Sequence, residues 1–159
     1  MLRLTNNHKY HCRFMIALAT ILITIIAFSQ AEVAAKSKVD WDKKLASGYK
    51  DLDFGDYDKA IKFFQSEVDH HPESGAARTG LGLALKKKGK SGEAVAQLRR
   101  ATEVEPDFAE SHYELGAMLE YNKDYGEACK SFERYLQLAP ISSKRASVED
   151  RIRNCKQNM

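Results

Sequence analysis

The chain has 159 residues, of which 43% are hydrophobic and 30% are charged, so it has the composition of a globular domain rather than of a disordered or fibrous chain. Its formal net charge is +3, from 25 basic and 22 acidic residues. Three of the bases and none of the acids precede residue 32, so the rest carries 22 of each and no net charge. This balance excludes the basic surface of a typical nucleic-acid-binding protein.

The first 31 residues differ from the rest of the chain. Three bases and no acid accompany an apolar run of 15 residues, and Ser29 and Ala31 have the small-residue spacing of a signal-peptidase site. We interpret residues 1–31 as a secretory signal peptide, cleaved after Ala31 and followed by a linker at residues 32–40. The alternative is an uncleaved membrane anchor, although 15 residues are few for a span of about 20. Both interpretations place the remaining chain outside the cytoplasm, in the periplasm, secreted, or anchored to the membrane.

Three prolines divide the following chain into equal parts. Pro72, Pro106 and Pro140 are spaced 34 residues apart. A fixed period of this length is typical of a solenoid built from repeated supersecondary units. With proline at position 32 of each unit, the three units are residues 41–74, 75–108 and 109–142.

Other residues recur in the same register. Position 8 is always glycine, position 20 is always alanine, and position 24 is always large and apolar. These residues are Gly48, Gly82 and Gly116, then Ala60, Ala94 and Ala128, then Phe64, Leu98 and Phe132. Because glycine within a helix costs about 1 kcal/mol relative to alanine, its recurrence predicts a point where a neighbouring helix comes close.

Each unit is predicted to form two amphipathic helices, at about positions 2–13 and 17–30. In the third unit, Tyr125, Ala128 and Phe132 recur at helical spacing and share one face. Asp56 and Asp124 lie where an N-cap is expected, so their carboxylates are predicted to accept from free amides of the helix start. Proline then ends each unit, because it cannot donate a backbone hydrogen bond and restricts the residue before it.

Glycine at position 8, alanine at 20, an aromatic residue or leucine at 24 and proline at 32 resemble the tetratricopeptide repeat. The resemblance covers residues 41–142 and implies an all-α fold, a right-handed α-α superhelix of three helix-turn-helix repeats. The chain departs from the family at position 4, where the family favours tryptophan and this chain has Lys44, Arg78 and His112. We expect His112 to be a packed core histidine.

Residues 143–159 are predicted to cap the stack. Val148, Ile152 and Cys155 lie at i, i+4 and i+7 among charged residues, which predicts a final helix at about residues 144–156. If this helix packs antiparallel to the preceding one, a rise of about 1.5 Å per residue brings Cys129 level with Cys155. We predict a disulfide between them, with two separate buried thiols as the alternative.

No arrangement of residues indicates catalysis, a metal site or a cofactor. Asp69, His70 and His71 are consecutive, and adjacent residues on a helix point about 100° apart, so they cannot face one ion together. Gly80 and Gly82 fall inside a predicted helix rather than in a phosphate-binding loop, and the basic run at residues 86–88 is expected to be a solvated helix end. The chain is therefore expected to be no enzyme, without a cofactor, metal or small-molecule substrate.

The resemblance implies a concave groove lined by positions 2, 5, 9, 12 and 13 of the first helix in each unit. The groove residues carried over to this chain are Asp42, Leu45, Tyr49, Leu52, Asp53, Ala76, Thr79, Leu83, Lys86, Lys87, Glu110, Tyr113, Ala117, Glu120 and Tyr121. Of these, Leu45, Tyr49, Leu83, Tyr113 and Tyr121 are expected to form an apolar and aromatic strip suited to a protein partner. The alternative is that neighbouring helices or the N-terminal linker cover part of this strip.

The resemblance implies a non-catalytic protein-interaction module, an adaptor that holds an extended segment or amphipathic helix of an envelope protein. A clamp for a C-terminal carboxylate is not expected, because Tyr49, Leu83 and Glu114 replace the polar and basic residues that such a clamp uses in the family. The alternative function is a structural subunit that self-associates into a larger assembly.

Overall fold

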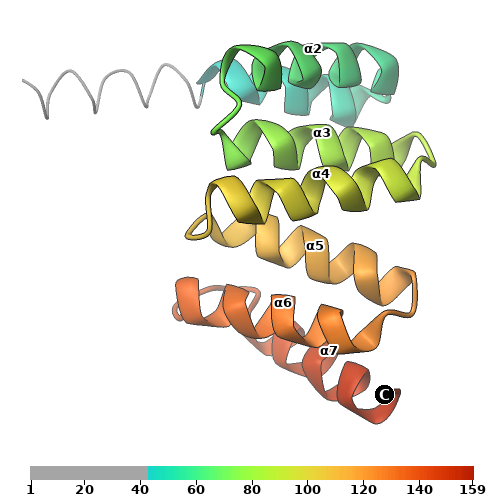
Figure 1. Cartoon of the computed structure of the whole chain (residues 1–159), viewed down its shortest axis with the longest axis vertical. Coiled ribbons are helices and arrows are strands. Elements are labelled where there is room, and N and C mark those ends of the chain that lie inside the picture. Colours follow the sequence, from blue (N-terminus) through green and yellow to red (C-terminus); the bar gives the residue numbers. More distant parts are fainter. Residues whose placement is uncertain (1–42) are drawn as a thin grey trace, which may run out of the picture. The chain divides into compact units, whose positions relative to one another are not determined.

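The computed structural model describes residues 43–159, and residues 45–159 form one compact unit. The predicted signal peptide, the linker and the predicted groove residue Asp42 lie outside the described residues. A helix at residues 43–54 is followed by α2 (Tyr57–His70), α3 (Gly75–Lys87), α4 (Ser91–Val104), α5 (Ala109–Tyr121), α6 (Tyr125–Leu138) and α7 (Arg145–Gln157) (Figure 1). Within this part of the chain there is no strand, which confirms the predicted all-α fold.

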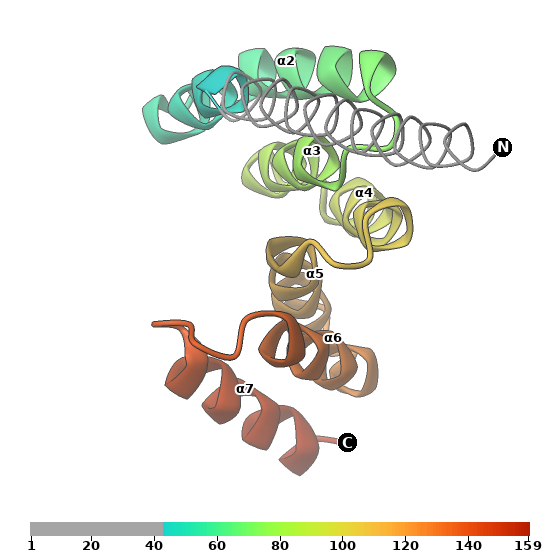
Figure 2. The ribbon, with the colours of Figure 1, turned by 90° about the vertical axis from the view of Figure 1, so that its left-hand side faces the viewer.

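The helices follow the predicted repeat register. Helices adjacent in the chain pack against each other from α2 to α7, and α3 also contacts α5, so that the first helices of successive repeats are neighbours (Figure 2). The observed bounds differ from the expected ones by at most one residue. None of the helices in the described part is long and apolar enough to cross a membrane.

The turn between the two helices of each repeat has a left-handed residue at the same repeat position. Gly55 has φ +84° and Gly89 has φ +83°, and the third repeat has Lys123 there, with φ +64°. Glycine adopts this conformation without a steric penalty, whereas lysine does not. The turn geometry is therefore kept in the third repeat despite a less suitable residue.

The recurring small and large residues form the core. The alanines at position 20 and the large residues at position 24 are all 0% exposed. A Cβ built on each position-8 glycine would lie 2.7 Å from Phe64 for Gly48, 2.8 Å from Leu98 for Gly82 and 2.8 Å from Phe132 for Gly116. These distances are too short for a real Cβ, which confirms that the recurring glycine marks a close approach between the two helices of a repeat.

The predicted capping role of two aspartates is wrong. Asp56 and Asp124 do occupy N-cap positions, but neither side chain accepts a cap hydrogen bond. Their ψ angles are 57° and 67°, outside the extended region that usually points an N-cap side chain at the free amides. Ser74, with ψ 106°, does accept from the Ala77 amide at 3.1 Å.

The expectation that His112 packs in the core is also wrong. Its side chain is half-buried, and its Nε2 lies 2.9 Å from the carbonyl oxygen of Pro106. Arg78, at the same repeat position, donates to the carbonyl of Pro72 from Nε at 3.1 Å and from Nη2 at 3.0 Å. In these two repeats the position-4 side chain therefore caps the carbonyl of the preceding proline, at the edge of the stack.

The predicted capping helix is confirmed, but the predicted disulfide is not. Val148, Ile152 and Cys155 are 0%, 8% and 0% exposed on α7, which packs on α6. Cys129 and Cys155 are both buried free thiols, and the Cys129 Sγ lies 3.6 Å from Glu133 one turn further along α6. Level positions along two helices do not fix the side-chain directions, and here the Cys129 thiol is directed at its own helix.

Candidate protein-binding groove

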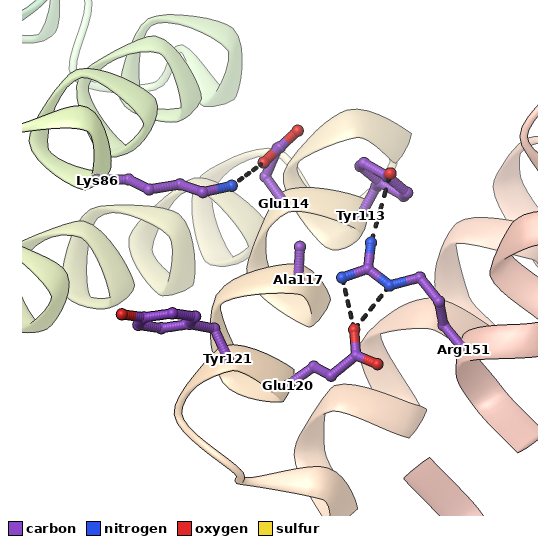
Figure 3. A pocket seen from close by; sticks show the side chains of 7 residues that line it. All are labelled: Lys86, Tyr113, Glu114, Ala117, Glu120, Tyr121 and Arg151. Atoms are coloured by element: carbon purple, nitrogen blue, oxygen red, sulfur yellow. Dashed lines mark hydrogen bonds and ion pairs between the residues drawn. The ribbon is translucent and has the colours of Figure 1, made fainter. Parts of the chain in front are cut away.

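A pocket of about 420 Å³ opens where α3, α5 and α7 meet (Figure 3). The helix α5 supplies most of its wall, the end of α3 supplies one lysine and α7 supplies one arginine. The lining residues are Lys86, Tyr113, Glu114, Ala117, Glu120, Tyr121 and Arg151.

The spacing of residues on α5 explains why this helix dominates the pocket. Tyr113, Ala117 and Tyr121 lie at i, i+4 and i+8, so they share one face of the helix, and Glu114 and Glu120 border that face. The small side chain of Ala117 lies between the larger ones and leaves the hollow open (Figure 3). The pocket is therefore built on a rigid helix rather than on a loop.

Arg151 is firmly held at one side of the pocket. Its Nε donates to Glu120 Oε2 at 2.7 Å, its Nη2 lies 2.5 Å from the same oxygen, and its Nη1 lies 3.4 Å from the Tyr113 hydroxyl. The guanidinium carbon also lies 4.6 Å from the ring centroid of Phe132. Several charge-assisted contacts and a ring face fix this side chain in one position.

Lys86 and Glu114 form a looser pair at the opposite side. Their closest nitrogen and oxygen atoms lie 3.4 Å apart. The lysine side chain is 38% exposed, whereas that of Glu114 is only 13% exposed. The lysine thus reaches into the pocket from the water side, and the carboxylate belongs to the wall.

A further acid and base form a pair beside Tyr113, outside the pocket lining. Lys144 Nζ lies 2.8 Å from Glu110 Oε1 and 4.3 Å from the ring centroid of Tyr113. Burial alone would lower the pKa of the Lys144 ammonium, but the hydrogen bond and charge of Glu110 raise it above its usual range. Burial raises the pKa of Tyr49 to about 12, and the charges of Glu110 and Glu114 add to this effect. Tyr49 of the first repeat therefore lies in a buried and negatively charged surrounding, to which two acids of α5 contribute.

Five of the residues predicted for the groove line the pocket. They are Lys86, Tyr113, Ala117, Glu120 and Tyr121. For Leu45 and Thr79 the prediction is wrong, because the two side chains are 4% and 0% exposed and cannot contact a partner. Thr79 Oγ1 donates to the Gly75 carbonyl at 2.8 Å inside its own helix. Both side chains lie too deep between packed helices to reach the surface, although the repeat pattern assigns them to the groove.

The other predicted groove residues lie outside the pocket, and their contact with a partner stays a prediction. Glu110 pairs with Lys144 as described above. Tyr49, Leu52, Ala76 and Leu83 are half-buried, and Asp53 and Lys87 are exposed.

The predicted aromatic strip is largely taken up by packing within the protein. The ring centroid of Tyr49 lies 5.2 Å from that of Phe64, and the ring centroid of Tyr113 lies 5.3 Å from that of Tyr135. Tyr121 is 76% exposed and remains open at the rim of the pocket. The alternative that neighbouring helices cover part of the strip is therefore the one that the structure shows.

Sequence reasoning missed the contribution of α7 to this site. It assigned the final helix only to covering the stack, whereas Arg151 lines the pocket and Lys144 covers a face of Tyr113. Arg151 lies three residues after Val148 and four before Cys155, both buried, so it borders the apolar face of the helix. A basic residue at the edge of the apolar face of the final helix is the sequence signal that could have suggested that Arg151 lines the pocket.

Within residues 43–159 no group of three or more His, Cys, Asp or Glu side chains is placed to hold a metal ion. At the end of α2, His70 Nδ1 lies 2.6 Å from the Ser66 carbonyl and His71 Nδ1 lies 3.7 Å from Glu73 Oε1.

The stacked helix pairs, with a pocket on the first helices of two repeats, define a helical-repeat protein. A family model described as "Tetratricopeptide repeat" matches residues 45–95 and 79–142, which together make up more than half of the chain. The chain belongs to the tetratricopeptide repeat family.

Several solved structures have the same fold. The TPR2B domain of yeast Sti1, in a complex with pHsp70, has a TM-score of 0.66 and 18% identity, over 74% of this chain and 97% of that one. The Yersinia enterocolitica type III secretion chaperone SycD, in complex with a peptide of the translocator YopD, has a TM-score of 0.65 and 14% identity, over 73% and 92%. The first TPR of Spaghetti (RPAP3), bound to the HSP90 peptide SRMEEVD, has a TM-score of 0.64 and 23% identity, over 72% and 88%. At these identities the likeness shows the fold alone. No protein of curated function matches the chain in a sequence search.

Proposed function

We propose that this protein is a non-catalytic interaction module that binds a segment of a partner protein in the pocket between α3, α5 and α7. The observation that carries the proposal is Tyr121, which is 76% exposed at the rim of a pocket whose other walls are fixed on helices. Tyrosines beside rigid pockets are frequent anchors of protein interfaces. The similar structures of Sti1, SycD and RPAP3 are each described with a bound protein or peptide, which supports this type of function.

The chemistry of the pocket supports binding rather than catalysis. The carboxylates of Glu114 and Glu120 are each paired with a base, so neither is placed as a free general base. Arg151 is fixed between Glu120 and two aromatic rings, as expected of a structural wall. An enzyme would need a reactive group directed into the hollow, and the lining side chains instead offer shape, one exposed aromatic ring and paired charges.

We further propose that the protein acts outside the cytoplasm, as an adaptor in the assembly or maintenance of an envelope complex. The support is the composition of residues 1–31, with bases, an apolar run and a small-residue cleavage pattern. The mass of the mature N-terminus tests this part. A chain beginning at Glu32 supports cleavage, an intact chain in the membrane fraction supports an anchor, and an intact chain in the cytoplasm contradicts both.

Binding in the pocket is tested by two matched alanine variants. Tyr121→Ala removes the exposed ring at the pocket, and Ile141→Ala removes an exposed apolar side chain, 101% exposed, that is not among the pocket residues. Each variant and the native protein are immobilised and used to capture partners from the native cell extract. The captured protein is then purified and titrated by calorimetry.

The expected result is a loss of about tenfold or more in affinity for Tyr121→Ala and no change for Ile141→Ala, with the helical circular dichroism of both unchanged. Equal binding by all three proteins would contradict the assignment of the pocket. The alternative, a self-associating subunit, predicts oligomers in light scattering. It receives no support at the C-terminal end, where α7 exposes the charged residues Asp150, Arg153 and Lys156.

A further inference from the structure

The ion pairs of the pocket differ in how easily they can be exchanged, and this difference indicates the chemistry of the partner. This inference rests on the proposed function. Arg151 cannot leave Glu120 without losing two contacts to that carboxylate and its place over the Phe132 ring. That pair behaves as a fixed part of the wall.

The pair of Lys86 and Glu114 is different. Lys86 is next to the last residue of α3, its side chain is 38% exposed, and its contact with Glu114 is a single one at 3.4 Å. An exposed lysine held by one long contact loses little when it turns into water. Glu114 lies in the middle of α5 with a side chain only 13% exposed, so its carboxylate cannot turn into water together with Lys86.

The surroundings of Glu114 favour a positive charge as its replacement partner. Glu110 and Glu114 lie four residues apart on α5, so the two acids share one face of this helix. Glu110 is paired with Lys144, and Glu120 is paired with Arg151. Once Lys86 turns away, Glu114 is the acid of the pocket that has lost its base.

We propose that the partner segment carries a lysine or arginine side chain that displaces Lys86 and pairs with Glu114. The exposed ring of Tyr121 packs on the aliphatic stem or the cation of this side chain. An acidic segment is disfavoured, because it would have to share Lys86 with Glu114 and would bring another carboxylate close to the acids of α5. The structure thus assigns the pocket to a basic anchor residue.

The test uses an array of random twelve-residue peptides, probed with the purified full chain and with single-site variants. Peptides whose binding is lost in Tyr121→Ala are the ones that use the pocket. We expect these peptides to be enriched in lysine or arginine. Replacing that base by glutamine should weaken binding about tenfold with the native protein and less than about twofold with Glu114→Gln.

A matched pair of lysine variants tests the displacement itself. Lys86→Met removes the competing base, so binding of basic peptides should strengthen about two- to fivefold. Lys87→Met makes the same change of charge on the neighbouring residue, which is exposed and does not line the pocket, and should have no effect. Unchanged helical circular dichroism shows that each variant is folded.

The outcomes separate this inference from the proposed function. Peptides that depend on Tyr121 but are acidic or uncharged would overturn the basic anchor and leave binding in the pocket standing. Weaker binding of basic peptides by Lys86→Met would also overturn it, because Lys86 would then be a contact of the partner. If no peptide depends on Tyr121, the proposed function fails and the basic anchor fails with it.

Discussion

The substitution Gly80→Ala tests how closely the first two repeats are packed. Gly80 lies in α3, and a Cβ built there would lie 2.5 Å from both Cδ1 and Cζ of the Phe64 ring on α2. The ring is 0% exposed. A Cβ at Gly48, on the first helix, would lie 2.7 Å from Cζ of the same ring. Two other helices therefore approach the Phe64 ring closely, which leaves it little room to move.

The magnitude follows from two opposing effects. Alanine in place of glycine stabilises a helix interior by about 1 kcal/mol. Forcing an extra methyl group into a well-packed core costs about 1–3 kcal/mol, and the confinement of Phe64 argues for the upper end of this range. We expect a net loss of about 2 kcal/mol in the free energy of unfolding, which lowers Tm by about 10 °C in a domain of this size.

Urea and thermal unfolding followed by circular dichroism measure this loss. The matched control is Gly92→Ala in α4, where a Cβ would meet nothing within 4 Å and where alanine should stabilise by about 0.4–1 kcal/mol. If Gly80→Ala is as stable as the native protein, or if both variants shift in the same direction, the close packing described above is wrong.

Three other predictions concern α7, the thiols and Tyr49. Replacing Arg151 by alanine removes its bonds to Glu120 and its stacking on Phe132, and should lower the free energy of unfolding by about 1–3 kcal/mol in the same urea assay. The control Arg153→Ala loses only an exposed ion pair and should change the free energy of unfolding by less than about 0.5 kcal/mol. Burial raises the pKa of both the Cys129 and Cys155 thiols. In the chain from Glu32 on, which lacks the third cysteine, Cys12, they should react with Ellman's reagent at pH 8 only after unfolding, and a disulfide formed without added oxidant would contradict the structure. The pKa of Tyr49 is raised to about 12 from an unfolded value near 10, so the folded state keeps a proton that the unfolded chain loses, and this contribution to the free energy of unfolding should disappear as pH rises from about 10 to 12. The same pH dependence of the free energy of unfolding in Tyr49→Phe would contradict this.

The helices were predictable because they depend on local spacing. Proline at a period of 34 residues, alanine at position 20 and a large apolar residue at position 24 each occupy one site in a repeated geometry. Helix boundaries then follow from the apolar periodicity and the prolines alone. The limit of local reasoning appears at Asp56, where a favourable residue occupies the N-cap but the backbone dihedrals direct its carboxylate elsewhere.

The site was predictable only in part, because it depends on how helices dock. The family's groove positions identified Tyr121 and Lys86, since these lie on the exposed face of a first helix. They did not identify Arg151, because its place follows from the angle at which α7 packs on α6. The same gap produced the wrong disulfide, since the rise along a helix fixes the height of Cys129 but not its rotation.

The most direct test of the central claim is site-specific photo-cross-linking in the native cell, with a photoreactive phenylalanine analogue at Tyr121 or at Ile141. Both positions are exposed, and only Tyr121 lines the pocket. If the groove holds a partner segment, the probe at Tyr121 gives a discrete adduct with another protein, and the probe at Ile141 does not. The same adduct from both positions, or an adduct from Ile141 alone, would contradict the groove as the binding surface.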